Sequence, residues 1–263
     1  MKKYLQTYKL SIQKALTYRS IEVIWIISAF ITPLVFMVLW SRNTGQSLLE
    51  FSKSEIISYY FILTFISQLV SPHIDWNVAD DINNGSLSFY LIKPYTYFIQ
   101  LFVQELGWKT VSMIFLVLPL MLFSLLFRNS LVIPSMSIIK LLSVISLCMV
   151  SYILIFLVQY FMGMLAFWVT QIRSFFRIFY MSSDLFAGKF FPLVLMPSVL
   201  KFVGRYLPFQ YFWYFPTMVI LGKQNLIGLK TSLIIMFSWI FVLIVLIRLI
   251  WNKGIKSYSS YGG

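Results

Sequence analysis

The sequence is poor in the residues that enzymes commonly use for chemistry. Its 263 residues include one cysteine and one histidine. A single cysteine cannot form an intrachain disulfide, and a single histidine supports neither a His/Cys metal cluster nor a plausible Ser-His-Asp triad. The phosphate-binding pattern GxxxxGK[ST] is also absent, so we do not expect this chain to hydrolyse ATP by P-loop chemistry. The sequence therefore favours a non-catalytic role.

Charged residues are scarce as well. They make up 11% of the chain, whereas soluble domains contain ~25%. Hydrophobic residues reach 60%, and the mean hydropathy is +0.84. This composition predicts an integral membrane protein. The net charge of +13 does not indicate nucleic acid, because the basic residues are scattered at the ends of apolar runs, where they orient helices and meet anionic headgroups.

The apolar runs predict an all-α protein with six membrane-spanning helices in a single domain, residues 1–263. A helix rises ~1.5 Å per residue and must cross a core of ~30 Å. The expected spans are residues 23–40, 55–72, 107–127, 138–169, 178–198 and 231–251. Residues 1–20 place Tyr4, Tyr8 and Ile12 on one helical face and lysines away from it. This pattern predicts an uncleaved amphipathic helix on the inner membrane surface.

A polar segment, residues 73–94, separates the second and third expected spans. It holds three of the eight acidic residues, Asp75, Asp80 and Asp81. Charge and unpaired backbone are too costly in lipid, so this segment is expected outside the bilayer. Asp80 and Asp81 fit the first turn of a short helix, and Gly85 permits the turn that ends it.

Two further polar features lie in or beside the expected spans. Asp184 lies within the fifth span, where an unpaired charge costs ~2.5 kcal/mol or more, so it is a candidate for attracting a cation or relaying protons. The alternative is that it pairs with Arg177 or Lys189. Glu105 and Lys109, four residues apart at the mouth of the third span, predict a surface ion pair.

The region from residue 188 to residue 222 is apolar but interrupted by four prolines. Pro192, Pro197, Pro208 and Pro216 leave no room for an unbroken span. Residues 199–222 are therefore expected to form two short re-entrant helices between the fifth and sixth spans, sheltered by protein or water.

The run DINNGSLSFYLIKP resembles the cytoplasmic loop of ABC-2-type permeases, the membrane subunits of ATP-driven exporters. Asp81 takes the acidic position of that loop, Gly85, Ser86 and Leu87 take the Gly-Thr-Leu positions, and Pro94 takes the closing proline. The basic residue usual in the family is absent, and two asparagines precede the glycine instead.

A second resemblance to the same family lies before the last span. Gly188, Pro192 and the Leu-Pro-Phe run at residues 207–209 match the outer re-entrant region. With the carboxyl-terminal Tyr261, Gly262 and Gly263, which are similar to one bacterial subgroup of these permeases, the two matches extend the resemblance over nearly the whole length. They imply a plasma-membrane protein of bacterial type, and the basic amino-terminal segment agrees with both termini being cytoplasmic.

The resemblance implies a coupling helix in the 73–94 segment that presses on a separate ABC ATPase. That partner would bind ATP and magnesium, and no cofactor is expected in this chain. A second permease, identical or homologous, and membrane lipid are the other expected partners. The expected coupling residues are Asp80, Asp81, Gly85, Ser86, Leu87 and Pro94.

The expected translocation pathway lies between two such chains and carries an amphiphilic or lipophilic substrate. Its candidate lining residues are Ser28, Thr32, Ser67, Gln68 and Asp184. The alternative function is a self-sufficient channel or secondary transporter that uses Asp184 as its coupling carboxylate.

Overall fold

The computed structural model describes residues 2–42, 51–94, 96–132, 134–135, 137–224 and 226–258. Within these ranges the chain is all-helical and contains no strand. The all-α prediction is confirmed for this part of the chain.

Long apolar helices form the body of the protein. They are α2 (Arg19–Arg42), α3 (Lys53–Val70), α6 (Tyr97–Leu126), α7 (Ile138–Met164) and α11 (Leu226–Ser257). Five helical stretches of the described residues are long and apolar enough to cross a membrane, and the second of them runs from Lys53 to Asn83. Five such stretches indicate a multi-pass membrane protein, but the expected count of six is not confirmed.

Shorter helices connect and cap these five. They are α1 (Lys2–Thr17), α4 (Asp75–Asn83), α5 (Leu87–Leu91), η1 (Leu165–Phe167), α8 (Arg173–Phe186), η2 (Leu193–Leu195), α9 (Ser198–Tyr206), η3 (Phe209–Tyr211) and α10 (Tyr214–Ile220).

The expected fifth span, residues 178–198, is not one helix. Its first part belongs to α8, which has 14 residues and ends at Phe186. Gly188 then takes a left-handed backbone conformation with φ of 80°, and Pro192 precedes η2, so the chain cannot continue as a helix. Asp184 therefore lies near the end of a short helix.

Two expected segments differ in extent from the observed helices. The expected third span, residues 107–127, lies mostly in α6, which already begins at Tyr97. The region 199–222 contains most of α9 together with the short helices η3 and α10. Its middle reaches into the bundle, because Ser151, halfway along α7, donates a hydrogen bond to the Tyr211 carbonyl over 2.8 Å.

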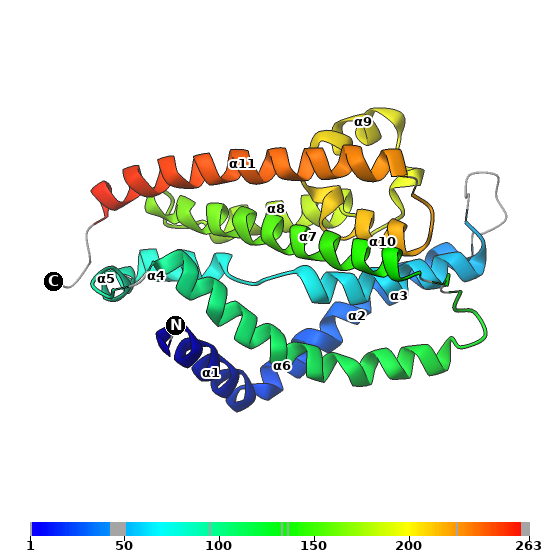
Figure 1. Cartoon of the computed structure of the whole chain (residues 1–263), viewed down its shortest axis with the longest axis horizontal. Helices are drawn as coiled ribbons and strands as arrows, with labels where there is room; N and C mark the ends of the chain where they lie inside the picture. Colours follow the sequence, from blue (N-terminus) through cyan, green and yellow to red (C-terminus); the bar gives the residue numbers. More distant parts are fainter. Residues whose placement is uncertain are drawn as a thin grey trace.

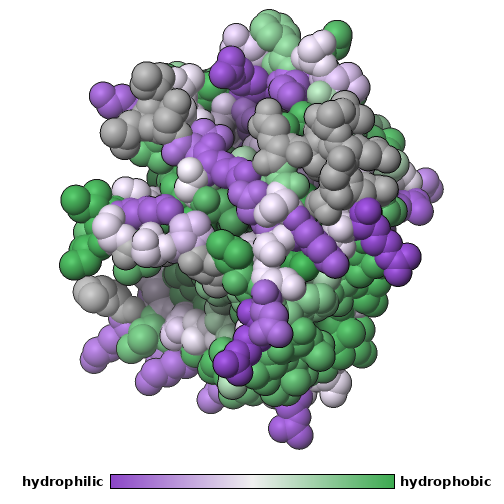
Figure 2. All heavy atoms as spheres, turned by 90° about the vertical axis from the view of Figure 1, so that its right-hand side faces the viewer, coloured by the Kyte–Doolittle hydropathy of each residue, from purple (hydrophilic) through white to green (hydrophobic). Residues whose placement is uncertain are grey.

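Helices α1, α4 and α5 lie at one end of the molecule, together with the carboxyl end of α11 (Figure 1). The backbone amide of Ser88 donates to the Tyr258 hydroxyl, which joins α5 to the residue after α11. The opposite end, where α3 and α11 begin, carries many hydrophilic side chains, and hydrophobic side chains cover the flank beside it (Figure 2). We call the end that holds α1, α4, α5 and the carboxyl end of α11 the coupling end.

The stretch that contains α3 is the most deeply buried of the five long apolar stretches. Ser52 and Glu55 form a capping box at its first turn, with N–O distances of 3.2 and 2.7 Å. Further along, Tyr59 is fully buried and donates to the Gly188 carbonyl over 2.6 Å, which ties the end of α8 to α3. Apolar side chains of α2 and α11 are instead exposed, as expected for surfaces that meet lipid or another chain.

Helix α1 packs along the first half of α6. Ser11 and Ala15 are buried, and the hydroxyls of Tyr8 and Thr110 lie 2.8 Å apart. The Lys3 ammonium also donates to the Pro94 carbonyl. The amino-terminal helix is thus attached both to a long helix and to the end of the 73–94 segment.

Candidate functional site

The most unusual local structure at the coupling end is the junction between α3 and α4, residues 71–74. Pro72 lacks a backbone donor and disfavours helical backbone at Ser71, so α3 ends at Val70. A helix end leaves carbonyl and amide groups without intrahelical partners, and inside an apolar protein these groups need other partners.

Side chains of α6 and α7 satisfy the junction. The Lys109 ammonium donates to the carbonyls of Gln68, over 2.9 Å, and Ser71. The Glu105 carboxylate accepts from the amide of His73 over 3.3 Å. The side-chain oxygen of Gln159 in α7 accepts from the amide of Ile74 over 3.2 Å.

The predicted surface ion pair between Glu105 and Lys109 is therefore wrong. Glu105 is only 7% exposed, and the two side chains form no ion pair in the described structure. Both are turned toward the junction, because unpaired backbone groups there compete for them.

A chain of polar contacts runs from the junction to Asp184. Trp213, just before α10, donates from its indole nitrogen to the Ser71 hydroxyl over 2.8 Å. The Lys189 ammonium lies 5.6 Å from the centroid of the Trp213 ring and pairs with Asp184 over 3.0 Å. Asp184 thus has the cationic partner that one reading of the sequence expected, and its charge is compensated.

Helix α4 has one buried and one exposed face. Asp75, Val78, Ala79 and Ile82 are buried, mainly against α7 and η1. Tyr180 of α8 donates to the Asp75 carboxylate over 2.6 Å. The helix approaches α7 at Gly163, where a Cβ atom would lie 2.7 Å from the Val78 Cβ and 2.9 Å from the Asp75 carbonyl oxygen. Only a residue without a side chain allows this approach.

The exposed face of α4 carries Trp76, Asn77 and Asp80. Asp80 pairs with Arg173 at the start of α8 over 3.3 Å, and the Arg173 guanidinium lies 5.3 Å from the Trp76 ring centroid. Both side chains of the ion pair are about half exposed or more, so the pair contributes little to stability. These side chains are available to a partner protein.

The expected coupling residues divide between this surface and the interior. Asp80 and Pro94 are accessible. Asp81 instead accepts from the hydroxyls of Tyr97, over 2.7 Å, and Ser86, over 2.9 Å. Leu87 is fully buried, and Gly85 holds φ of 76° at the turn after α4. Asp81, Gly85, Ser86 and Leu87 therefore shape the segment from within.

The expected pathway residues are dispersed. Ser28 is exposed on α2, and Thr32 lies one turn further along. The Ser67 hydroxyl donates to the Thr64 carbonyl, and the Gln68 carbonyl is occupied by Lys109. Two cavities, of about 390 and 400 Å³, are lined by other residues. No cavity described here brings these four together with Asp184.

Sequence reasoning missed several residues of this site. Trp76 and Asn77 precede the recognised motif, and Gln159 and Tyr180 lie inside long apolar runs. The one available signal was that Gln159 is an amide within a strongly apolar helix, where a polar side chain needs a partner.

These features define a multi-pass α-helical membrane protein with a short polar helix held at one end of its bundle. A family model for ABC-2 family transporter proteins matches residues 25–262, and the chain belongs to this family. It is accordingly a transmembrane protein of an ABC transporter, as the loop motif indicated. A comparison with curated proteins gives no match.

Proposed function

We propose that this chain is the permease subunit of an ATP-driven exporter and that separate ATPase subunits, which bind ATP and magnesium, drive it through α4. The observation that carries this proposal is the anchoring of α4. Its outer face is accessible, and its inner face is tied through the junction to α6, α7, α8 and the segment before α10. A push on α4 is thereby delivered to most of the bundle.

The path of force follows the polar contacts. Displacement of α4 moves the junction, and Lys109 and Glu105 transmit this motion to α6. Trp213 transmits it to the segment that leads into α10. Helix α1 moves with α6, on which it packs, and acts as a second lever.

In the membrane, we place the coupling end in the cytoplasm of a bacterial cell, with both termini there. Helix α8 and the turn after it supply the sixth crossing, since α8 starts beside Asp80 and Gly188 meets Tyr59 in the outer half of α3. The segments from α9 to α10 enter from the outer side and return to it as a re-entrant pair.

The substrate passes between two permease chains, identical or homologous. Exposed apolar side chains of α2, such as Trp25 and Ile31, supply a surface for a second chain or for an amphiphilic or lipophilic substrate. Because Lys189 compensates Asp184, the alternative of a self-sufficient transporter has no observation in its favour.

Co-purification of the ATPase tests the proposal. Asn77→Arg places a long cation on the exposed face of α4 without removing a buried group, and we expect it to abolish ATPase capture. Asn129→Arg is the matched control, because Asn129 is exposed in the turn after α6 at the opposite end. If Asn77→Arg captured as much ATPase as Asn129→Arg does, docking on α4 would be contradicted.

A further inference from the structure

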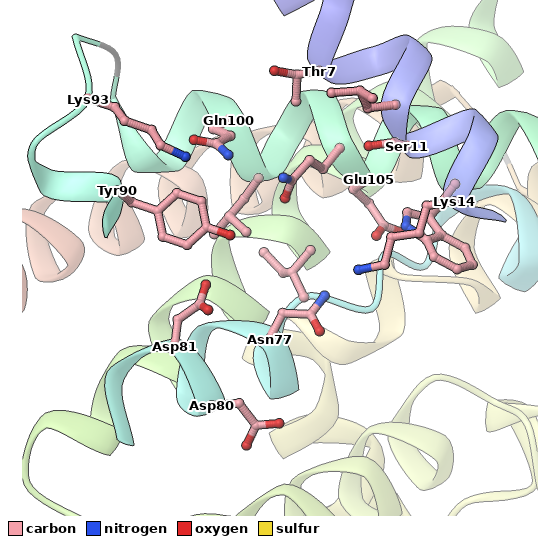
Figure 3. Close-up of a pocket in the computed structure, with 15 residues that line it drawn as sticks. Thr7, Ser11, Lys14, Asn77, Asp80, Asp81, Tyr90, Lys93, Gln100 and Glu105 are labelled. Carbon is pink, nitrogen blue, oxygen red and sulfur yellow. The ribbon is translucent and has the colours of Figure 1, made fainter. Parts of the chain in front are cut away.

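A cavity of about 390 Å³ lies between α1 and α4 (Figure 3). Helices α1, α4 and α6 and the end of α5 contribute to its lining. The Lys14 ammonium, the Glu105 carboxylate and the Tyr90 hydroxyl point into it. Most of its lining residues are polar or charged.

One buried side chain in the lining of the cavity has a polar atom without a hydrogen-bond partner in the described part of the chain. Gln100, in the first turn of α6, is only 5% exposed. Its side-chain oxygen is buried and accepts no hydrogen bond from any described residue. A buried amide oxygen without a donor costs about 1–3 kcal/mol, so the site favours an occupant that brings an N–H or O–H group.

The charged groups around the cavity indicate whether this occupant is an anion, a cation or a zwitterion. Glu105, Asp81 and Asp80 contribute carboxylates, and Glu105 is nine-tenths buried. Lys14 of α1 and Lys93 after α5 contribute ammonium groups, and Lys14 makes no hydrogen bond or ion pair within the described part of the chain. A simple anion would meet the carboxylates, and a simple cation would meet the ammonium groups of Lys14 and Lys93. A zwitterion satisfies both sides.

We propose that this cavity binds an ethanolamine-phosphate group. Its ammonium donates to the Gln100 oxygen and faces the Glu105 and Asp81 carboxylates, and its phosphate faces Lys14. A choline group is discriminated against, because a quaternary ammonium has no N–H to give to Gln100. The source of the group is either the headgroup of phosphatidylethanolamine or a soluble phosphoethanolamine compound.

Occupation would connect two elements that the protein uses at its coupling end. Lys14 belongs to α1, whereas Asp81 belongs to α4. A ligand that contacts both helices holds α1 against α4. The concentration of ethanolamine-phosphate groups would then determine how far α4 moves independently of α1.

The test uses the full chain without any ATPase, so its outcome is independent of the proposed function. The chain is placed in phosphatidylcholine nanodiscs with a minor fraction of phosphatidylethanolamine or phosphatidylglycerol, and native mass spectrometry counts the lipids retained. Equilibrium dialysis in detergent then compares glycerophosphoethanolamine with glycerophosphocholine. We expect the ethanolamine form to be preferred about tenfold over the choline form, the effect of one hydrogen bond between charged and neutral groups.

Variants separate this site from general lipid binding. Gln100→Met removes the acceptor at similar volume and should abolish the preference, whereas Gln100→Glu should keep it and guards against loss through misfolding. Lys14→Met should weaken retention, and Lys9→Met, exposed on α1 outside the cavity, should not.

Each outcome decides the proposal. Preference for the lipid alone supports a membrane source, and preference for glycerophosphoethanolamine as well supports a soluble one. Equal binding of ethanolamine and choline forms overturns the proposal and leaves water as the donor to Gln100. A preference that survives Gln100→Met overturns it too.

Discussion

The contact between α4 and α7 at Gly163 provides a sharp test of how force reaches the bundle. In Gly163→Ala the new Cβ would lie 2.7 Å from the Val78 Cβ and 2.9 Å from the Asp75 carbonyl oxygen. Carbon atoms pack at about 3.5–4.0 Å, so α4 must move outward by about 1 Å. The hydrogen bonds from Ile74 to Gln159 and from Tyr180 to Asp75 resist this movement.

Overpacking of this kind costs about 1–3 kcal/mol. We expect Gly163→Ala to unfold at a lower temperature in detergent and to bind the ATPase while stimulating its ATP hydrolysis less than wild type does. Gly204→Ala is the control. Its nearest neighbour is a ring carbon of Phe186 at 3.1 Å, a side chain that can turn aside.

The reasoning would be refuted if Gly163→Ala stimulated ATP hydrolysis as wild type does. The close packing of α4 on α7 would then be irrelevant to coupling, even with a lowered unfolding temperature.

Three further predictions concern the junction and the surface of α4. Lys109→Met leaves the Gln68 and Ser71 carbonyls unpaired and should cost about 1–3 kcal/mol in thermal unfolding, whereas Lys2→Met on the exposed face of α1 should be neutral. Asp80→Asn breaks an exposed ion pair and should change stability by less than about 1 kcal/mol while reducing ATPase capture in pull-downs; an unchanged capture would remove Asp80 from the interface. Gly85→Ala must hold φ of 76° and should cost about 1–2 kcal/mol, seen as a lower unfolding midpoint.

The long helices were predictable because their signal is local. An apolar run bounded by polar residues forms a helix in lipid whatever its neighbours are, and the 138–169 run gives α7 and η1. The breaks between residues 188 and 222 were predictable for the same reason, since proline restricts its own backbone. The early end of α8 was not predictable, because a hydrogen bond from Tyr59 in α3 also holds the turn at Gly188.

The polar anchors of the site could not be predicted, because they depend on which helices meet. The spacing of Glu105 and Lys109 suits an ion pair on an isolated helix. In the folded chain the end of α3 lies beside them, and its unpaired carbonyls and amides are better partners. Asp81 illustrates the same limit, since Tyr97 and Ser86 hold it inside the segment that the motif marks as a contact surface.

The central claim is that the exposed face of α4 lies in the cytoplasm and receives the ATPase. Cys148 is buried and is the only cysteine, so Cys148→Ser gives a background for a single reporter. In that background Asn77→Cys is treated with a membrane-impermeant maleimide. We predict labelling in inverted vesicles but not in intact cells, and protection when the ATPase is bound. Labelling of intact cells, or labelling that the ATPase leaves unchanged, would contradict the claim.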